Sequence, residues 1–126
     1  MSTPSNTARP GVIEIERLGD VTIITPATEV ETMQWELIEQ AAEIVLIPLK
    51  RNPSTSVIVD LSRVAFFGSV FLSLLLRCHK LVKQQGGDIV LCGVSERARE
   101  LLKITNLDTL WAIYKDRQEA LAAVAG

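Results

Sequence analysis

Residues Val57–Ser69 read VIVDLSRVAFFGS, and this stretch decides the fold. It opens with Val57-Ile58-Val59, a short continuous apolar run of the kind found in strands that are covered on both faces. From Ser69 to about Gln85 the apolar residues instead recur at helical spacing. The sequence therefore predicts a buried strand that bends and enters a helix at Ser69, the unit from which parallel α/β sheets are built.

Two strands and a helix are expected before this unit. Residues 12–17 alternate between apolar and polar side chains, and residues 21–25 are rich in β-branched ones, so together they predict a hairpin that turns at Leu18-Gly19-Asp20. Helical spacing follows from Thr32 to about Ile47. Pro48 lacks a backbone donor and is expected to end or kink that helix.

The rest of the chain repeats the alternation of strand and helix. Gly86-Gly87 is expected to stop the helix that begins at Ser69, since glycine readily adopts the left-handed conformation found at helix ends. The remaining expected elements are a strand at 89–91, a helix at 95–105 with Ser95 as its N-cap, a strand at 110–114 and a helix at 116–124. The order ββαβαβαβα predicts a single α/β domain with a mixed, mostly parallel central sheet of about five short strands and about four helices.

Composition limits the classes of function. The chain has 126 residues, of which 48% are hydrophobic and 22% charged, which fits one folded domain expected to span residues 11–126. A formal net charge of −2 gives no broad basic surface for nucleic acid or an anionic membrane. Residues 1–10 are polar, have no apolar signal-peptide core and are expected to form a flexible tail. No apolar run is long enough to span a membrane, so a cytoplasmic location is expected.

Few residues carry the chemistry of an enzyme. Cys78 and Cys92 form no metal or redox motif and lie in apolar patterns, so both are expected to be reduced and structural. His79, the single histidine, follows Cys78 directly in a predicted helix, where neighbours point about 100° apart, so the two cannot form a nucleophile–base pair by themselves. It falls on the polar side of that helix and is expected to be a solvated surface residue. The acidic residues considered for a metal pocket are scattered, at Asp20, Asp60 and Asp88. We therefore expect no enzyme activity, no cofactor and no metal.

Ser69 has two alternative roles. As the N-cap of its helix, its hydroxyl would accept a hydrogen bond from a free backbone N–H, a role that contributes about 0.5–2 kcal/mol. As a phosphosite, it would place a phosphate against free amides and the positive end of the helix dipole without unfolding the domain. Gly68 is expected to permit the turn into the helix.

The same stretch carries a family resemblance. The run from Val57-Ile58-Val59-Asp60-Leu61-Ser62 to Gly68-Ser69 resembles the "strand, D-L-S, hydrophobic, D-S-[ST]-G-L" signature of STAS domains, the anti-sigma factor antagonist family. Further matches lie at Gln84–Asp88, at Leu101-Leu102 and at Asn106-Leu107. The resemblance covers essentially the whole chain after residues 1–10 and implies a STAS fold.

The resemblance also implies a role for the strand-to-helix turn. In that family an anti-sigma kinase phosphorylates the hydroxyl residue after the motif aspartate, which releases the partner, and Ser69 matches its position. Glu29 stands where the loop after the family's second strand usually has an aspartate. The motif is degenerate here, because Gly68 replaces the aspartate, Val70 the second hydroxyl residue and Phe71 the small glycine.

A helical wheel adds an apolar pair to the expected surface. Leu72 and Leu76 are four residues apart and lie among polar and charged side chains, away from the main apolar face of their helix. They are expected either to extend the Ser69 turn into a partner-binding or dimer surface, or to tuck under a neighbouring helix. The full set of expected partner-binding residues is Glu29, Phe66, Phe67, Gly68, Ser69, Leu72, Ser73 and Leu76.

These expectations define three alternative functions. The first is an anti-sigma factor antagonist-like regulator that binds a kinase-type anti-sigma factor or a related protein, with Ser69 as a phospho-switch. The second is a constitutive assembly module, a homodimer for example, that is no longer phosphorylated. The third is a small-ligand sensor. The sequence leaves these alternatives open.

Overall fold

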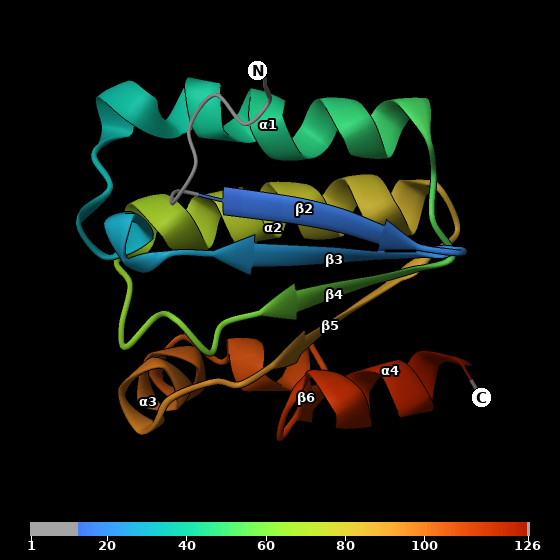
Figure 1. The fold of residues 1–126 in the computed structure, drawn as a ribbon. Coiled ribbons are helices and arrows are strands. Elements are labelled where there is room, and N and C mark those ends of the chain that lie inside the picture. The colour runs from blue at the N-terminus through green and yellow to red at the C-terminus, as the bar shows by residue number, and fades with distance from the viewer. Residues whose placement is uncertain (1–12, 126) are drawn as a thin grey trace, which may run out of the picture.

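The computed structural model describes residues 13–125, and within them a five-stranded sheet lies at the centre, in the order β2-β3-β4-β5-β6 (Figure 1). The tail expected at residues 1–10 lies outside the described residues. β2 and β3 form an antiparallel hairpin, and every other neighbouring pair is parallel. The predicted mixed, mostly parallel sheet is thereby confirmed. The strands are β2 (Ile13–Leu18), β3 (Val21–Pro26), β4 (Ser56–Asp60), β5 (Asp88–Cys92) and β6 (Ile113–Tyr114).

Helices cover the sheet in the predicted order, ββαβαβαβα, which is also confirmed. α1 and α2 pack on one face, α4 packs against β4 and β5 on the other, and α3 lies beside the carboxyl ends of the central strands (Figure 1). Across residues 13–125 the helices are α1 (Ile38–Arg51), α2 (Ser69–Gln84), α3 (Glu96–Ile104) and α4 (Arg117–Ala125), with 3-10 turns η1 (Thr28–Thr32), η2 (Trp35–Leu37) and η3 (Leu107–Thr109).

β4 is covered on both faces, as its apolar sequence predicts. Val57 and Val59 point into the larger core cluster, together with side chains of α1 and α2. Ile58 points the opposite way and packs with Ile23 of β3 and Ala120 of α4. Because successive strand residues alternate between faces, one three-residue run supplies both cores. This burial fixes the end of β4, where the candidate site begins.

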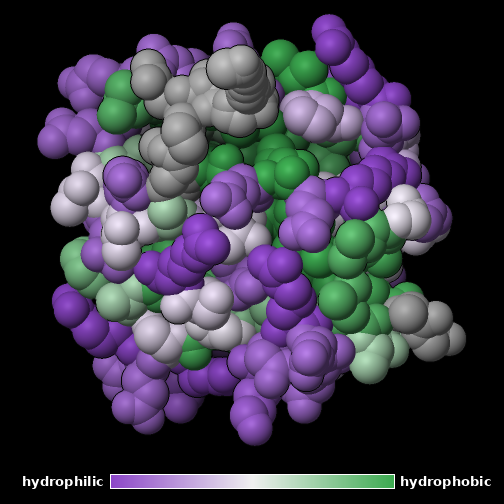
Figure 2. Space-filling model, viewed as in Figure 1, coloured by the Kyte–Doolittle hydropathy of each residue, from purple (hydrophilic) through white to green (hydrophobic). Residues whose placement is uncertain are grey.

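The hairpin side of the sheet is more polar. Glu14 and Glu16 of β2 are exposed, whereas Ile13 on the alternate face is buried. Figure 2 shows hydrophilic side chains over much of this view, with hydrophobic ones gathered at the right near α4. Val21 and Leu121 are partly buried against the smaller core cluster. The alternation of buried Ile13 with exposed Glu14 and Glu16 confirms the period of two expected for β2.

The first long helix differs from its prediction at both ends. It begins at Ile38 instead of Thr32, because the preceding residues form two 3-10 turns, of which the first is anchored by buried Val30. It also continues through Pro48 to Arg51, so of the two expected effects of Pro48, an end or a kink, the end is wrong. Pro48 lacks a donor, but its carbonyl still accepts from Asn52 N–H, and Leu49 in the same last turn is buried in the core.

The last strand is shorter than expected, and the segment before it makes a contact that the sequence did not predict. β6 holds two residues, and the segment before it buries Trp111. The indole Nε1–H of Trp111 donates to Nδ1 of His79 at 3.1 Å, with the two rings edge to face. The expectation that His79 is a solvated surface residue is wrong, because its ring accepts a hydrogen bond from Trp111, the buried residue just before the edge strand β6.

We expect the free energy of unfolding to fall as the pH is lowered below about 6.5, the ordinary pKa of histidine. The Nδ1 atom of His79 can accept from Trp111 only while the imidazole is neutral, and burial, with a further contribution from Lys83, lowers the pKa of His79 below its ordinary value of 6.5. Between the folded and unfolded pKa values the unfolded chain binds more protons, so this stability is present above pH 6.5 and is lost as the pH falls. Denaturant unfolding of the wild type and of His79→Phe measures the effect. A wild-type curve as flat as that of the variant would contradict it.

The predicted end of α2, both ends of α3 and the predicted start of α4 are confirmed. Gly86, after α2, has a φ of 82°, and Asn106, after α3, has a φ of 66°. Ser95 caps α3, since its hydroxyl accepts from Ala98 N–H at 3.1 Å. Asp116 caps α4 through Glu119 N–H at 2.9 Å.

Candidate functional site

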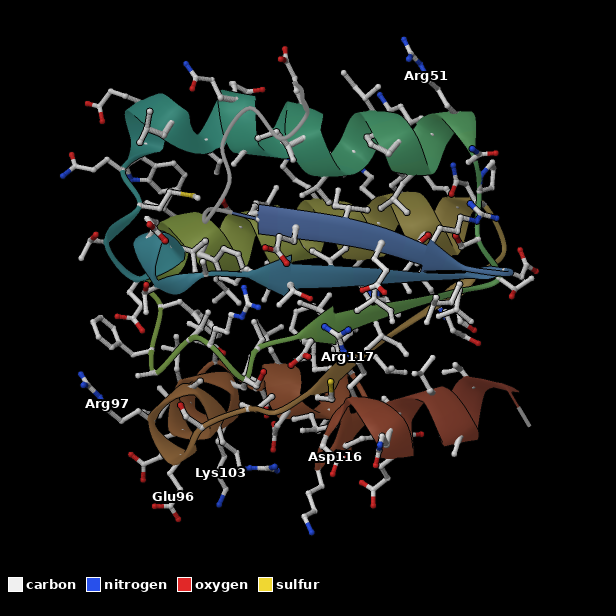
Figure 3. The ribbon with its side chains drawn as sticks, in the orientation of Figure 1. Arg51, Glu96, Arg97, Lys103, Asp116 and Arg117 are labelled. Carbon is white, nitrogen blue, oxygen red and sulfur yellow. The ribbon has the colours of Figure 1, made fainter. Side chains whose placement is uncertain are left out.

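The connection from β4 to α2 begins at a buried carboxylate. Asp60 ends β4 and accepts from Ser62 N–H at 3.0 Å and from Nε of Arg117 at 3.1 Å. Burial by itself raises the pKa of Asp60, but the hydrogen bonds from Ser62 and Arg117 outweigh it, so the pKa lies below its ordinary value of 3.8. In Figure 3 Arg117 reaches from α4 toward the strands. The carboxylate is thus a charged structural anchor for the loop that follows.

The middle of the same loop is held from two sides. The N–H of Ala65 donates to the carboxylate of Glu31 in η1 at 2.7 Å, and its carbonyl accepts from the hydroxyl of Ser95 at the start of α3. Both polar groups of one residue are therefore bonded to neighbouring elements. We call this arrangement the Ala65 clamp. The sequence predicted Ser95 only as a helix cap, and no sequence signal pointed to Glu31.

The two phenylalanines of the loop have opposite environments. Phe67 is buried and packs edge to face on Phe71, with ring centroids 5.3 Å apart. Phe66 is half-buried, and the guanidinium of Arg97 lies 4.5 Å from its ring centroid, a cation–π contact. Arg97 projects from α3 in Figure 3. Of the two rings, only that of Phe66 is available to a partner without opening the core.

Gly68 and Ser69 occupy different positions from those expected. Gly68 is the N-cap of α2 with φ −105° and ψ −167°, an extended backbone that any residue adopts, and no atom lies within 4 Å of where its Cβ would be. Gly68 was expected to permit the turn into α2, but the turn makes no use of the conformational freedom of glycine. Ser69 is the first helical residue and not the N-cap, so its predicted capping role is wrong. Its side chain is exposed, and its hydroxyl has no hydrogen-bond partner among residues 13–125.

The apolar pair on α2 is split between core and surface. Leu72 is only 9% exposed and belongs to the main core, so of its two expected places the one under a neighbouring helix is confirmed and the one on a partner surface is wrong, whereas Leu76 is 38% exposed. The cause is α1, which packs alongside α2 and is joined to it by the ion pair of Arg77 and Glu39 at 3.2 Å. Ser73 is half-buried, and its hydroxyl donates to the carbonyl of Val70 at 2.7 Å.

The remaining predicted residues gather at one end of the sheet. Glu29 is exposed in η1, the turn that Glu31 joins to the β4–α2 loop. The structure thus brings Glu29 to the same end as Phe66, Gly68 and Ser69, at the carboxyl ends of β3 and β4 (Figure 1). We call Glu29, Phe66, Gly68, Ser69 and Leu76 the Ser69 surface.

Metal-binding and nucleophilic groups are sparse in the described part of the chain. Residues 13–125 hold no cluster of three His, Cys, Asp or Glu side chains able to bind a metal ion. Cys78 and Cys92 are free and buried, as predicted, and burial raises the pKa of each thiol to about 12. Such thiols are poor nucleophiles at neutral pH. Of the described helices, none has the length and apolar character required to cross a bilayer.

The fold and the strand-to-helix turn match a known family. The family model described as the STAS domain covers residues 12–120. The chain belongs to the STAS domain family. Along its sequence it is 24% identical to an anti-sigma F factor antagonist of Paenibacillus polymyxa over 109 residues, which cover 86% of this chain and 91% of that protein.

Solved structures support the same assignment. A STAS domain protein of Planctomyces limnophilus, described as an anti-sigma-factor antagonist, is 35% identical with a TM-score of 0.79, over 90% of this chain and 98% of that one. The unphosphorylated form of the anti-sigma factor antagonist SpoIIAA gives a TM-score of 0.78 over 91% of this chain and 97% of that one, at 19% identity, which supports the fold alone. The chain is thus a member of the anti-sigma factor antagonist family by sequence and structure, and this family is regulatory.

Proposed function

We propose that this protein is a non-enzymatic, cytoplasmic regulator that binds a kinase-type anti-sigma factor through the Ser69 surface. The observation that carries the proposal is Ser69 itself, exposed at the first position of α2 behind a loop held by the Ala65 clamp. A surface that is ordered before binding loses less conformational entropy when a partner docks. The regulatory relatives at 24% and 35% identity support the class of partner. We infer that residues 11–126 form the binding domain.

A phosphate on Ser69 would act as the switch. The first turn of α2 has no acidic residue and no side-chain cap, so its free N–H groups and the positive end of the helix dipole favour a phosphate. The added charge would lie beside Phe66, where a partner must bury apolar area, and would weaken docking. SpoIIAA is known in a phosphorylated and an unphosphorylated form, which supports the compatibility of this fold with such a modification.

The test is phosphorylation followed by binding. Incubation with a GHKL-type anti-sigma kinase and ATP should add one phosphate, located at Ser69 by mass spectrometry and absent in Ser69→Ala. Ser69→Ala should bind the kinase as the wild type does, whereas Ser69→Asp should bind at least about tenfold more weakly, since charge enters an interface that must desolvate. Equal binding of wild type, Ser69→Ala and Ser69→Asp would refute the switch while leaving the docking surface in place.

Restoring the family's aspartate should stabilise the protein and improve the switch. Because Gly68 has an ordinary backbone conformation and free space around it, Gly68→Asp should raise the free energy of unfolding by about 0.5–1 kcal/mol through capping and the helix dipole. Gly68→Ala is the matched control, since it adds a Cβ without an acceptor and should gain no capping. Thermal unfolding measures the difference, and the rate of Ser69 phosphorylation should rise in Gly68→Asp alone. A Gly68→Asp variant less stable than Gly68→Ala would contradict the N-cap assignment.

Constitutive assembly remains the second candidate function. The exposure of Leu76 and the residues that replace the motif, Gly68 and Val70, favour it. Because Leu72 is buried, Leu76→Glu is the informative variant. Self-association that is lost in Leu76→Glu but unchanged in Ser69→Asp would support this function over the switch.

A further inference from the structure

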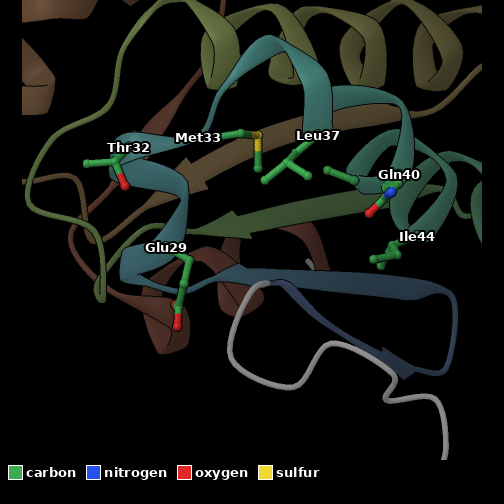
Figure 4. Close-up of a pocket in the computed structure, with 7 residues that line it drawn as sticks. Glu29, Thr32, Met33, Leu37, Gln40 and Ile44 are labelled. Atoms are coloured by element: carbon green, nitrogen blue, oxygen red, sulfur yellow. The ribbon is translucent and has the colours of Figure 1, made fainter.

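A pocket on the α1 side of the molecule is separate from Ser69. Its volume is about 430 Å³, and it lies between η1, η2 and the first turns of α1 (Figure 4). Apolar side chains of Met33, Leu37 and Ile44 make up most of its wall, and Glu29 stands at one side (Figure 4). The complete lining is Glu29, Thr32, Met33, Leu37, Gln40, Ala41 and Ile44.

Large apolar side chains beside the pocket are open to solvent. Leu37 in its wall is 50% exposed, and Trp35 in the same 3-10 turn is 58% exposed. Tryptophan is among the residues that most often dominate the binding energy of protein interfaces. Because the wall is exposed, the pocket cannot enclose a ligand. It can instead be covered from outside by a segment of another protein.

The chain segment that forms the pocket carries acidic side chains and no basic ones. Residues 28–44, which include the whole lining, contain five acidic residues and no lysine, arginine or histidine; the acidic ones are Glu29, Glu31, Glu36, Glu39 and Glu43. Glu39 is paired with Arg77, and Glu31 is bonded to Ala65. Glu29, Glu36 and Glu43 have no ion-pair partner among residues 13–125. The rim therefore carries negative charge that a basic partner would neutralise.

We propose that this pocket binds a basic, amphipathic segment of a protein partner, which inserts an apolar side chain beside Leu37 and places lysine or arginine near Glu36 and Glu43. On α1 these charges flank the lining, because Gln40 and Glu43 are three residues apart and share one side of the helix. The inference goes beyond the Ser69 switch, since no contact in it involves Ser69. Glu29 belongs to both surfaces, so one partner can span them.

The experiment uses the full chain and a synthetic probe. The probe is an 18-residue helical peptide with leucines along one face and lysines elsewhere, and its sister peptide has glutamates in place of the lysines. Amide chemical-shift mapping in 50 mM NaCl should show binding of the lysine peptide at least about tenfold tighter than of the glutamate peptide, with shifts confined to residues 29–47, and 500 mM NaCl should weaken it.

Two sets of variants separate pocket binding from general attraction. Leu37→Asp should weaken binding of the lysine peptide by about tenfold, because it removes the apolar anchor. The double variant Glu36→Lys, Glu43→Lys should weaken it by about fivefold, because it removes the negative charge. Ile104→Asp and Glu100→Lys are matched controls on exposed α3 and should bind as the wild type does. Shifts centred elsewhere, equal binding of the two peptides, or unchanged binding by Leu37→Asp would overturn the proposal. None of these readouts depends on Ser69, so their failure would leave the phospho-switch untouched.

Discussion

Arg117→Ala is expected to lower the free energy of unfolding by about 2–3 kcal/mol. The guanidinium donates to Asp60 at 3.1 Å, to Thr25 Oγ1 at 2.9 Å and to Glu16 at 3.3 Å. Without it, the buried carboxylate of Asp60 keeps the bond from Ser62 but loses its counter-ion. The expected loss is below that of a fully buried pair, because the Arg117 side chain is itself 35% exposed. Denaturant unfolding at pH 7 measures it.

The pH dependence of this loss identifies Asp60 as its cause. The pKa of Asp60 is lowered in the folded protein, so its contribution is present above the ordinary value of 3.8 and is lost as the pH falls through the folded pKa. The loss caused by Arg117→Ala should therefore be larger at pH 7 than at pH 3. Glu16→Gln is the control for the exposed contact and should cost no more than about 0.5 kcal/mol. Equal losses for Arg117→Ala at the two pH values would show that packing and not the ion pair is responsible.

Ser95→Ala is expected to cost about 2 kcal/mol, because one hydroxyl has two structural roles. It accepts from Ala98 N–H as the cap of α3, and it donates to the carbonyl of Ala65 in the loop before Ser69. Loss of the cap accounts for about 1 kcal/mol and loss of the second bond for a similar amount. Amide hydrogen exchange of residues 65–67 should also become about tenfold faster, since the loop opens more often.

Conservative variants of Ser95 separate its two roles. Ser95→Asp retains an acceptor for Ala98 N–H but has no donor for Ala65, so α3 should keep its stability while the loop exchanges faster. Ser95→Thr retains both functions and should behave as the wild type. If Ser95→Asp leaves the exchange of residues 65–67 unchanged, Ser95 does not hold the loop, and Glu31 alone carries the Ala65 clamp.

Much of the fold followed from local patterns, and the errors in the helices lie at the two ends of α1. The run Val57–Val59 predicted a strand buried on both faces because three apolar residues in succession need two cores. Pro48 misled because a proline in the last turn loses one hydrogen bond, while burial of Leu49 in the same turn retains the helix. Residues 32–37 have helical spacing, yet in the structure Thr32 ends one 3-10 turn and Trp35–Leu37 form another, with extended backbone at Met33 and Gln34 between them.

The candidate site was less predictable, because its contacts join distant parts of the chain. The position of Ser69 followed from the switch of period at the end of β4, and its exposure is consistent with the predicted surface. Glu31 lies 34 residues before Ala65, and Arg117 lies 57 residues after Asp60, so no local pattern relates them. The place of Leu72 stayed open between surface and core, because the helical wheel of α2 does not include α1, which packs alongside α2.

The free space around Gly68 has a consequence for divergence within this family. Under the proposed function, a side chain at this position would change the surface that a partner meets, while the backbone conformation at Gly68 is one that any residue adopts. If the Ser69 surface binds the partner as proposed, a single exchange of glycine for aspartate here would alter recognition and leave the path of the backbone unchanged. Phe67 and Phe71 are buried and pack on each other, and a Cβ added at Gly68 would meet open space instead of Phe71, so the core beside the turn would stay as it is.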